Sequence, residues 1–137
     1  LDIMYYIKFI MKNNFFKLAK YLYYFSLLAL FVLYLFPGSL IGYFLYGNLG
    51  LQPDIINNPI GTSINHFFFF IFLSILASIS NIKKIQILTS FYFILLVSIF
   101  LEISHFFIPN RAFEVYDLLA NMTGVILIFF LKKIIKW

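Results

Sequence analysis

Residues 101–124 read LEISHFFIPNRAFEVYDLLANMTG and lie between two long apolar stretches of the chain. This segment holds the polar side chains Glu102, His105, Arg111, Glu114, Asp117 and Asn121. Between stretches that are apolar enough to enter a membrane, ionisable groups are costly and usually functional. The segment therefore predicts a functional site at the place where two membrane-embedded helices meet.

The composition identifies the class of protein. Of the 137 residues, 64% are hydrophobic and 11% are charged, whereas soluble domains are about 45–50% apolar and roughly 25% charged. This excludes a soluble domain with a single core and predicts one all-α integral membrane domain over residues 1–137. Cysteine is absent, which excludes disulfides and thiolate metal sites. The net charge of +5 comes from lysines beside apolar stretches, which is typical of topology signals rather than of nucleic-acid binding.

Four apolar stretches predict a transmembrane four-helix bundle with spans over residues 21–36, 64–80, 87–107 and 114–131. Residues 1–20 predict an interfacial, partly amphipathic lead-in that stays attached, and Pro37-Gly38 predicts the end or a kink of the first helix. The connector 39–63 contains an apolar part, residues 40–46, for which an interfacial position and an extension of the first helix both remain open. Turns are predicted at residues 52–54, 57–59 and 81–86.

The distribution of basic residues predicts the orientation. Only Arg111 lies near the span ends on one side, and the other side holds Lys8, Lys12, Lys17, Lys20, Lys83, Lys84, Lys132, Lys133 and Lys136. Under the positive-inside rule this asymmetry places both termini in the cytoplasm. The abundance of Phe, Ile, Asn and Lys favours an AT-rich, bacterial genome, so the predicted location is a bacterial inner membrane.

This topology brings the polar residues of three helices to one membrane level. They are His66 at the start of the second span, Glu102 and His105 at the end of the third, Arg111 in the outer turn, and Asp117 and Asn121 at the start of the fourth. Helical spacing places Glu102 and His105 on one face, and Glu114, Asp117, Asn121 and Gly124 on another. These six residues, His66, Glu102, His105, Arg111, Asp117 and Asn121, are the predicted ligand-binding site.

Structural explanations exist for several of these residues taken singly. Glu114 suits a helix N-terminus, Asn121 suits hydrogen bonding between helices, and Arg111 suits a lipid phosphate. Glu102 is the hardest to explain in this way, since an unpaired acid at mid-depth costs ~2.5–3.5 kcal/mol on insertion scales. It needs a partner, and Arg111 and His66 are the candidates.

Three kinds of chemistry fit the set. Arg111 with the two histidines suits a phosphate or carboxylate head group. His66, Glu102 and His105, together with Asp117, suit a metal, although a single Glu-x-x-His motif is a weak signal because di-metal bundles carry two. A histidine and a carboxylate also suit acid–base catalysis. No nucleophile elbow, phosphate loop or dinucleotide fingerprint is present, so no reaction and no cofactor are predicted.

The polar segment resembles the signature of VanZ-like membrane proteins. The acid Glu102, the Pro-x-Arg turn ending at Arg111 and the helix start Asp117-x-x-x-Asn121-x-x-Gly124 match that pattern over about residues 63–130. His66 before a Phe-rich helix resembles the family's second motif. The sequence departs where His105 replaces the usual Gln, and where Thr62-Ser63 replace an Asp-Lys pair.

The resemblance implies a cell-envelope protein, because the family's founding member is associated with low-level resistance to the antibiotic teicoplanin. The leading expectation is a site that binds an anionic lipid or lipid-linked head group, with Arg111 as the anion ligand. A membrane-embedded, metal-dependent enzyme and an accessory subunit of a larger membrane complex are the alternatives. The expected partner is a membrane lipid or lipid-linked envelope precursor, with a membrane protein as a further option and nucleic acid excluded.

Overall fold

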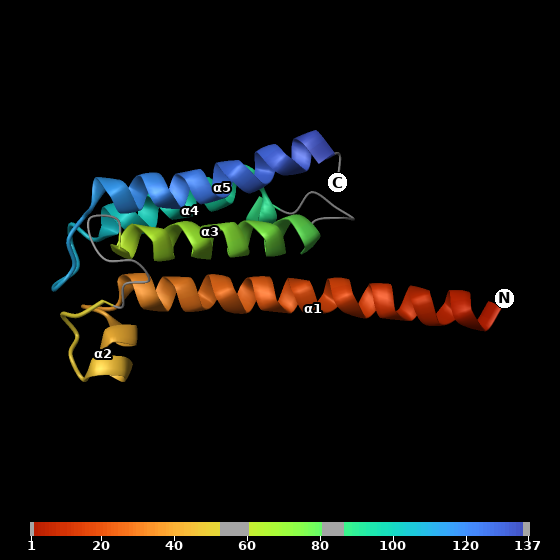
Figure 1. Cartoon of the computed structure of the whole chain (residues 1–137), viewed down its shortest axis with the longest axis horizontal. Coiled ribbons are helices and arrows are strands. Elements are labelled where there is room, and N and C mark those ends of the chain that lie inside the picture. The colour runs from red at the N-terminus through yellow and green to blue at the C-terminus, as the bar shows by residue number, and fades with distance from the viewer. Residues whose placement is uncertain (1, 53–60, 81–86, 136–137) are drawn as a thin grey trace.

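The computed structural model describes residues 2–52, 61–80 and 87–135, and these residues form helices without strands. The elements are α1 (Asp2–Leu35), α2 (Leu40–Tyr46), α3 (Gly61–Ser80), the 3-10 turn η1 (Ile87–Thr89), α4 (Phe91–Ser104) and α5 (Val115–Ile135). Helices α1, α3, α4 and α5 lie side by side, each antiparallel to the next along the chain (Figure 1). The predicted all-α class is confirmed for the described residues.

Within the described residues, three helical segments are long and apolar enough to cross a membrane: Ile10–Leu35, Ser63–Ser80 and Val115–Ile135. The predicted third span, residues 87–107, instead contains a 14-residue helix, Phe91–Ser104. The helix begins late because Ser90 caps it, with its side chain accepting a hydrogen bond from the backbone N–H of Phe93 at 3.2 Å. At 1.5 Å per residue α4 is about 21 Å long, against a hydrocarbon core of ~30 Å. A fourth crossing and the side of each terminus stay predictions.

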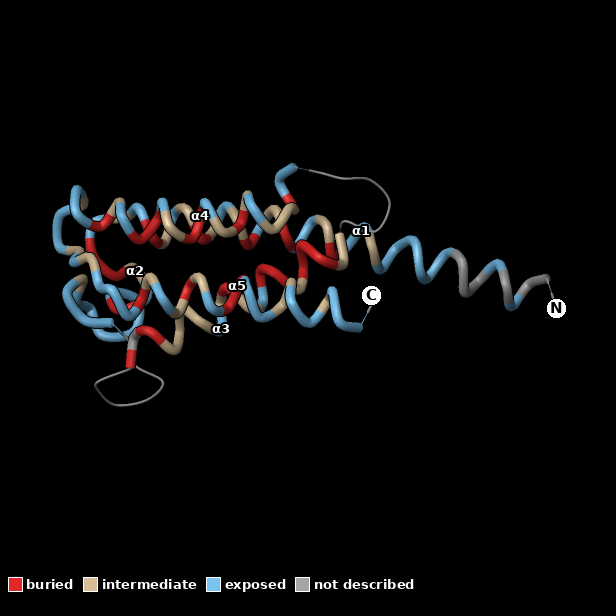
Figure 2. Tube along the Cα trace, turned by 90° about the horizontal axis from the view of Figure 1, so that it is seen from above, coloured by how far each residue is buried: buried red, intermediate tan, exposed pale blue. Residues whose placement is uncertain are grey.

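The lead-in and the first span are one continuous helix, because α1 has 34 residues without a break. It ends at Leu35, just before Pro37 and Gly38, where Gly38 adopts a left-handed φ of 89°. Its N-terminal part extends beyond the other helices (Figure 2), and residues 10–15 there are exposed. The candidate crossing within α1, Ile10–Leu35, contains residues 21–35 of the predicted first span.

The apolar residues 40–46 form the separate helix α2, so they do not continue α1 as one helix. Ser39 caps its N-terminus by accepting a hydrogen bond from the N–H of Gly42 at 2.9 Å, and Gly47 closes its C-terminus with φ 68°. A backbone hydrogen bond of 2.7 Å from Ser39 to the carbonyl of Leu49 folds this segment back on itself. The turns predicted at 53–54, 57–59 and 81–86 lie outside the described residues.

The inward faces of the four long helices form an apolar core, which includes Tyr23, Leu30, Phe70, Leu73, Ile94, Leu101 and Val125. Their outward faces are apolar too, and large side chains such as Phe25, Phe72, Leu96, Phe100 and Phe130 are exposed on them. A soluble helical protein covers its outside with polar side chains. An apolar outer surface around helices whose backbone bonds are internally satisfied suits lipid, and the protein is therefore described as a membrane protein.

Helices α3 and α5 approach each other closely at Gly124. A Cβ atom built on Gly124 would lie 2.7 Å from the carbonyl oxygen of Phe67 and 3.2 Å from the backbone nitrogen of Ile71. Small residues allow such approaches between membrane helices. The contact brings the buried face of α5 that carries Asp117 and Asn121 against the start of α3.

Candidate functional site

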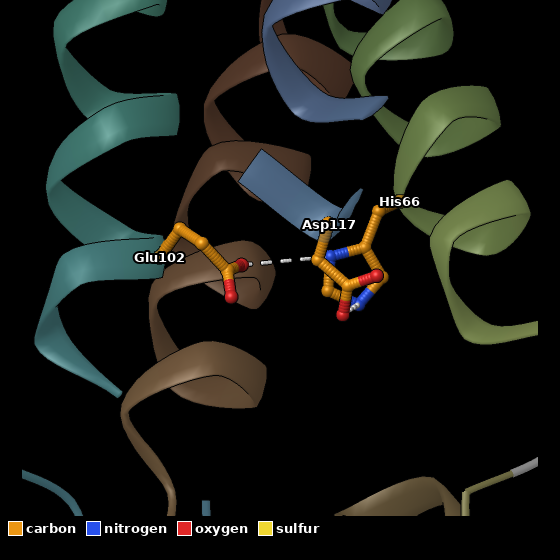
Figure 3. A group of neighbouring side chains, drawn as sticks. All are labelled: His66, Glu102 and Asp117. Atoms are coloured by element: carbon orange, nitrogen blue, oxygen red, sulfur yellow. Dashed lines mark ion pairs between the residues drawn. The ribbon is translucent and has the colours of Figure 1, made fainter. Parts of the chain in front are cut away.

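Four helix ends meet at one end of the bundle, and each contributes a polar side chain to the same buried cluster. Tyr34 lies in the last turn of α1, His66 near the start of α3, Glu102 in the last turn of α4, and Asp117 and Asn121 in the first two turns of α5. Figure 3 shows that His66, Glu102 and Asp117 come from three different helices and point toward one another. Glu102 and Asn121 are fully buried and Asp117 is 5% exposed.

A chain of hydrogen bonds joins Glu102, Asn121, Tyr34 and His66. The amide nitrogen of Asn121 lies 3.4 Å from Oε2 of Glu102, and its carbonyl oxygen lies 3.1 Å from the hydroxyl of Tyr34. The reverse amide orientation would bring a carbonyl oxygen against a carboxylate, so Asn121 donates to Glu102 and accepts the proton of Tyr34. The Tyr34 oxygen, 2.7 Å from Nδ1 of His66, then accepts a hydrogen bond from that nitrogen.

Asp117 holds the other side of the His66 ring. Its Oδ2 lies 3.6 Å from Nε2 of His66, and its Oδ1 accepts a hydrogen bond from the hydroxyl of Ser63. Because Ser63 donates its proton to Asp117 rather than to His66, it is not arranged as an activated nucleophile. His66 therefore has Tyr34 on Nδ1 and a carboxylate near Nε2.

His105 follows α4 and packs beside Glu102. Its Nδ1 lies 3.3 Å from Oε1 of Glu102, an oxygen that also accepts a hydrogen bond of 3.3 Å from the backbone N–H of Glu114. The imidazole stacks on Tyr34 with ring centroids 5.4 Å apart and planes 19° apart. His105 is 4% exposed, and its Nε2 is buried without a hydrogen-bond partner among the described residues.

Arg111 reaches the C-terminal end of α1 instead of the acidic cluster. Its Nη2 donates to the carbonyl oxygen of Leu33 at 2.6 Å, and its Nε lies 3.4 Å from the carbonyl oxygen of Phe36. Cations are favoured at helix C-termini, where carbonyl groups lack intrahelical partners. Burial lowers the pKa of Arg111 from its ordinary value, while the nearby Tyr34 and Glu102 oppose that shift; an arginine nevertheless stays protonated.

A pocket of about 120 Å³ opens beside the cluster, between the end of α1, the start of α2 and the start of α3. One part of its wall is polar and includes Tyr34, Ser39, Gln52, Asn65, His66, His105 and Arg111. The rest is apolar and consists of Leu30, Leu33, Leu40, Ile41 and Phe69. The pocket thus combines charged and apolar lining residues, a combination that suits an amphiphile.

The structure places the predicted site residues as follows. His66, Glu102, His105, Asp117 and Asn121 join one buried cluster, and Arg111 lines the pocket beside it. Of the two partners considered for Glu102, His66 is the contact, with its Nδ1 3.8 Å from Oε2. Glu114 does not share the buried face of Asp117, because its side chain is exposed just before α5. Partial burial and the charges of Asp117 and Glu102 raise the pKa of Glu114.

Sequence reasoning missed Tyr34 and Ser63. Tyr34 joins His66 to Asn121, but tyrosines near span ends are ordinarily read as interfacial anchors. The available signal was helical spacing, because Tyr23, Leu30 and Tyr34, seven and four residues apart, are all buried on one face of α1. Ser63 stood out only as a departure from the VanZ-like pattern.

The arrangement offers two chemical capacities. One nitrogen of His66 and one carboxylate oxygen each from Glu102 and Asp117 lie within 4.8 Å of one another, as a metal ligand set requires. The guanidinium and the two imidazoles around the pocket suit an anion. This set of candidate metal ligands contains Asp117 in place of the predicted His105. The Nδ1 of His105 contacts the other carboxylate oxygen of Glu102, Oε1.

No family model, curated protein or solved structure matched the chain. The similarity to VanZ-like proteins therefore rests on the residues of the polar segment alone and stays a prediction.

Proposed function

We propose that the protein binds the anionic head group of a membrane amphiphile, a lipid or a lipid-linked envelope precursor, in the pocket at the end of the bundle. The observation that carries this proposal is the pocket itself. Its lining combines Arg111, His66 and His105 with five apolar side chains. A ligand with a charged head and an apolar body matches both kinds of lining residue.

Arg111 supplies the charge that attracts the head group. Within the described parts of the chain, no carboxylate oxygen lies within 4.0 Å of its guanidinium, since the ion pairs there involve only His66 and His105. Its Nε and Nη2 bond the carbonyl oxygens of Phe36 and Leu33 at the end of α1. These bonds to neutral groups fix the side chain at the pocket wall without cancelling its charge. A charge-assisted hydrogen bond to a phosphate or carboxylate is worth about 1.5–3 kcal/mol.

The proposal includes a setting in the cell. We propose a VanZ-like cell-envelope protein of a bacterial inner membrane, linked through that family to antibiotic resistance, with α4 as a fourth membrane crossing. The termini are cytoplasmic and the pocket lies at the outer leaflet. The ends of α1 and α5 that lie nearest the termini are at the end of the bundle opposite α2 (Figure 1), and α2 contributes to the pocket lining. This arrangement is compatible with the lysine distribution.

Lipid selectivity tests the proposed ligand class. Native mass spectrometry is applied to protein equilibrated with phosphatidylglycerol and phosphatidylcholine of identical acyl chains in equal amounts. Wild type is expected to retain phosphatidylglycerol preferentially, and Arg111→Gln is expected to reduce that preference about tenfold or more, the equivalent of at least 1.4 kcal/mol. Arg111→Lys keeps the positive charge without the planar guanidinium fork, so its preference for phosphatidylglycerol is expected to lie between those of wild type and Arg111→Gln.

Lys133→Gln is the matched control, since it removes one positive charge from the exposed opposite end of α5. It should leave the lipid preference unchanged. The proposal fails if wild type shows no preference for the anionic lipid. It also fails if Arg111→Gln lowers only the thermal stability and retains the same lipids as wild type.

The orientation is testable because the native chain has no cysteine. A cysteine introduced by Gly50→Cys lies at the pocket end, and one introduced by Lys133→Cys lies at the opposite end; both positions are exposed. In intact cells with a permeabilised outer envelope, a membrane-impermeant thiol reagent is expected to label position 50 and to spare position 133. Labelling of position 133 alone would show that the orientation is the reverse of the proposed one.

A further inference from the structure

The cluster beneath the pocket holds two buried carboxylates without a fixed cation. Glu102 is fully buried and Asp117 is 5% exposed. Among the residues the structure describes, neither carboxylate has a lysine or arginine nitrogen within 4.0 Å, and their ionic partners are His66 and His105. Buried carboxylates are costly unless they are paired or bind a metal.

The hydrogen bonds around His66 define which of its nitrogens is free. Since Tyr34 gives its proton to Asn121, Nδ1 of His66 is the donor to the Tyr34 oxygen, 2.7 Å away. In the neutral ring Nε2 then carries a lone pair and lies 3.6 Å from Oδ2 of Asp117. Two acceptors that face each other require a cation between or beside them.

We propose that His66, Glu102 and Asp117 bind a divalent first-row metal ion, with Mn²⁺ and Zn²⁺ as the chemical class. One ligand atom from each residue lies within 4.8 Å of the others. Around a tetrahedral ion with bonds of about 2.1 Å, neighbouring ligand atoms lie about 3.4 Å apart. Closing the set around an ion therefore needs side-chain movements of less than about an ångström. Mixed imidazole and carboxylate ligands suit these ions.

Two neighbours complete the surroundings of such a site. Tyr34 accepts from Nδ1 and fixes the ring in the tautomer that a metal-binding histidine needs, as outer partners of metal ligands commonly do. His105 is buried and lines the pocket, and its Nε2 has no hydrogen-bond partner in the described part of the chain. This unpartnered buried nitrogen belongs to a residue that contacts the proposed ligand Glu102, and the observation is independent of the three ligands.

The chain offers an unusually clean test, because its only two histidines are His66 and His105. Protein purified with a tag that lacks histidine, freed of metal by chelation, is titrated with Mn²⁺ and followed by electron paramagnetic resonance. We expect uptake of one ion per chain. Pulsed measurements on the bound ion should detect the ¹⁴N coupling of a coordinated imidazole.

Variants then assign the ligands. His66→Gln is expected to remove the principal imidazole coupling, and the near-isosteric Asp117→Asn should weaken Mn²⁺ binding at least tenfold. Glu114→Gln is the matched control, because it removes an exposed carboxylate next to the cluster and should leave the affinity unchanged. Zn²⁺ should displace Mn²⁺ from wild type in a one-to-one ratio.

Several outcomes would overturn the site. One is the absence of saturable Mn²⁺ uptake, which would leave a proton as the cation of the cluster. The others are a bound ion without ¹⁴N coupling and equal Mn²⁺ affinities for wild type and Asp117→Asn. The spectroscopic result on wild type does not depend on whether a variant folds. Metal uptake and lipid selectivity are separate readouts, so failure of this inference is distinguishable from failure of the proposed head-group binding.

Discussion

Replacement of Glu102 by alanine should lower the free energy of unfolding by about 3–5 kcal/mol, which is the cost of removing one partner from a buried ionic network. The substitution leaves the amide of Asn121, the backbone N–H of Glu114 and Nδ1 of His105 without the carboxylate that each contacts in the native structure. Reversible unfolding in mixed detergent micelles, or steric trapping in bicelles, measures this loss.

Glu114→Ala is the control for that measurement. Glu114 is also acidic and lies near the same helix end, but its side chain is exposed, and surface substitutions usually change stability by less than about 0.5 kcal/mol. Equal losses for the two variants would mean that Glu102 does not organise the cluster. Glu102→Gln, which keeps the shape and one acceptor, should lie between wild type and alanine.

Gly124→Ala should also destabilise the protein, by about 1–3 kcal/mol, the usual cost of overpacking a close contact. Helix propensity alone predicts the opposite sign, because alanine is favoured over glycine in a helix by about 1 kcal/mol. The steric effect is expected to dominate, since the new Cβ would lie 2.7 Å from the carbonyl oxygen of Phe67. That atom belongs to the backbone of α3 and moves only if the helices separate.

The adjacent Thr123→Ala is the matched substitution on the exposed face of α5. The Thr123 hydroxyl donates to the carbonyl of Leu119 within its own helix, at 2.6 Å, so its loss should change stability by less than about 0.5 kcal/mol. A stabilising effect of Gly124→Ala in the same unfolding assay would show that α3 and α5 are farther apart than described.

The meeting of the polar residues was predictable because it follows from topology and helical spacing. Antiparallel helices bring the end of one and the start of the next to the same level, and i, i+3 and i, i+4 spacing places Asp117 and Asn121 on one face. Both residues are buried in the cluster that also holds His66 and Glu102. The role of these residues stays a prediction, because sequence position does not reveal a ligand.

Other features depend on contacts that the sequence does not reveal. The inward turn of Tyr34 is fixed by its bonds to His66 and Asn121, which lie on other helices. The short length of α4 follows from the cap formed by Ser90, a residue that is equally compatible with the interior of an apolar stretch. The bonds of Arg111 to the end of α1 join residues far apart in the chain.

Photo-crosslinking at the pocket wall tests head-group binding most directly. The photoreactive amino acid p-benzoylphenylalanine is placed at Ile41, which lines the pocket, or at Phe44, which is exposed on the same helix and outside that lining. Cells are grown with ³²P-phosphate, and lipid attached to the purified protein is counted. We expect labelling at Ile41 that falls about tenfold when Arg111→Gln is added, and labelling at Phe44 that does not respond to that substitution. Absence of label at Ile41, or an equal signal there with and without Arg111, would contradict the account.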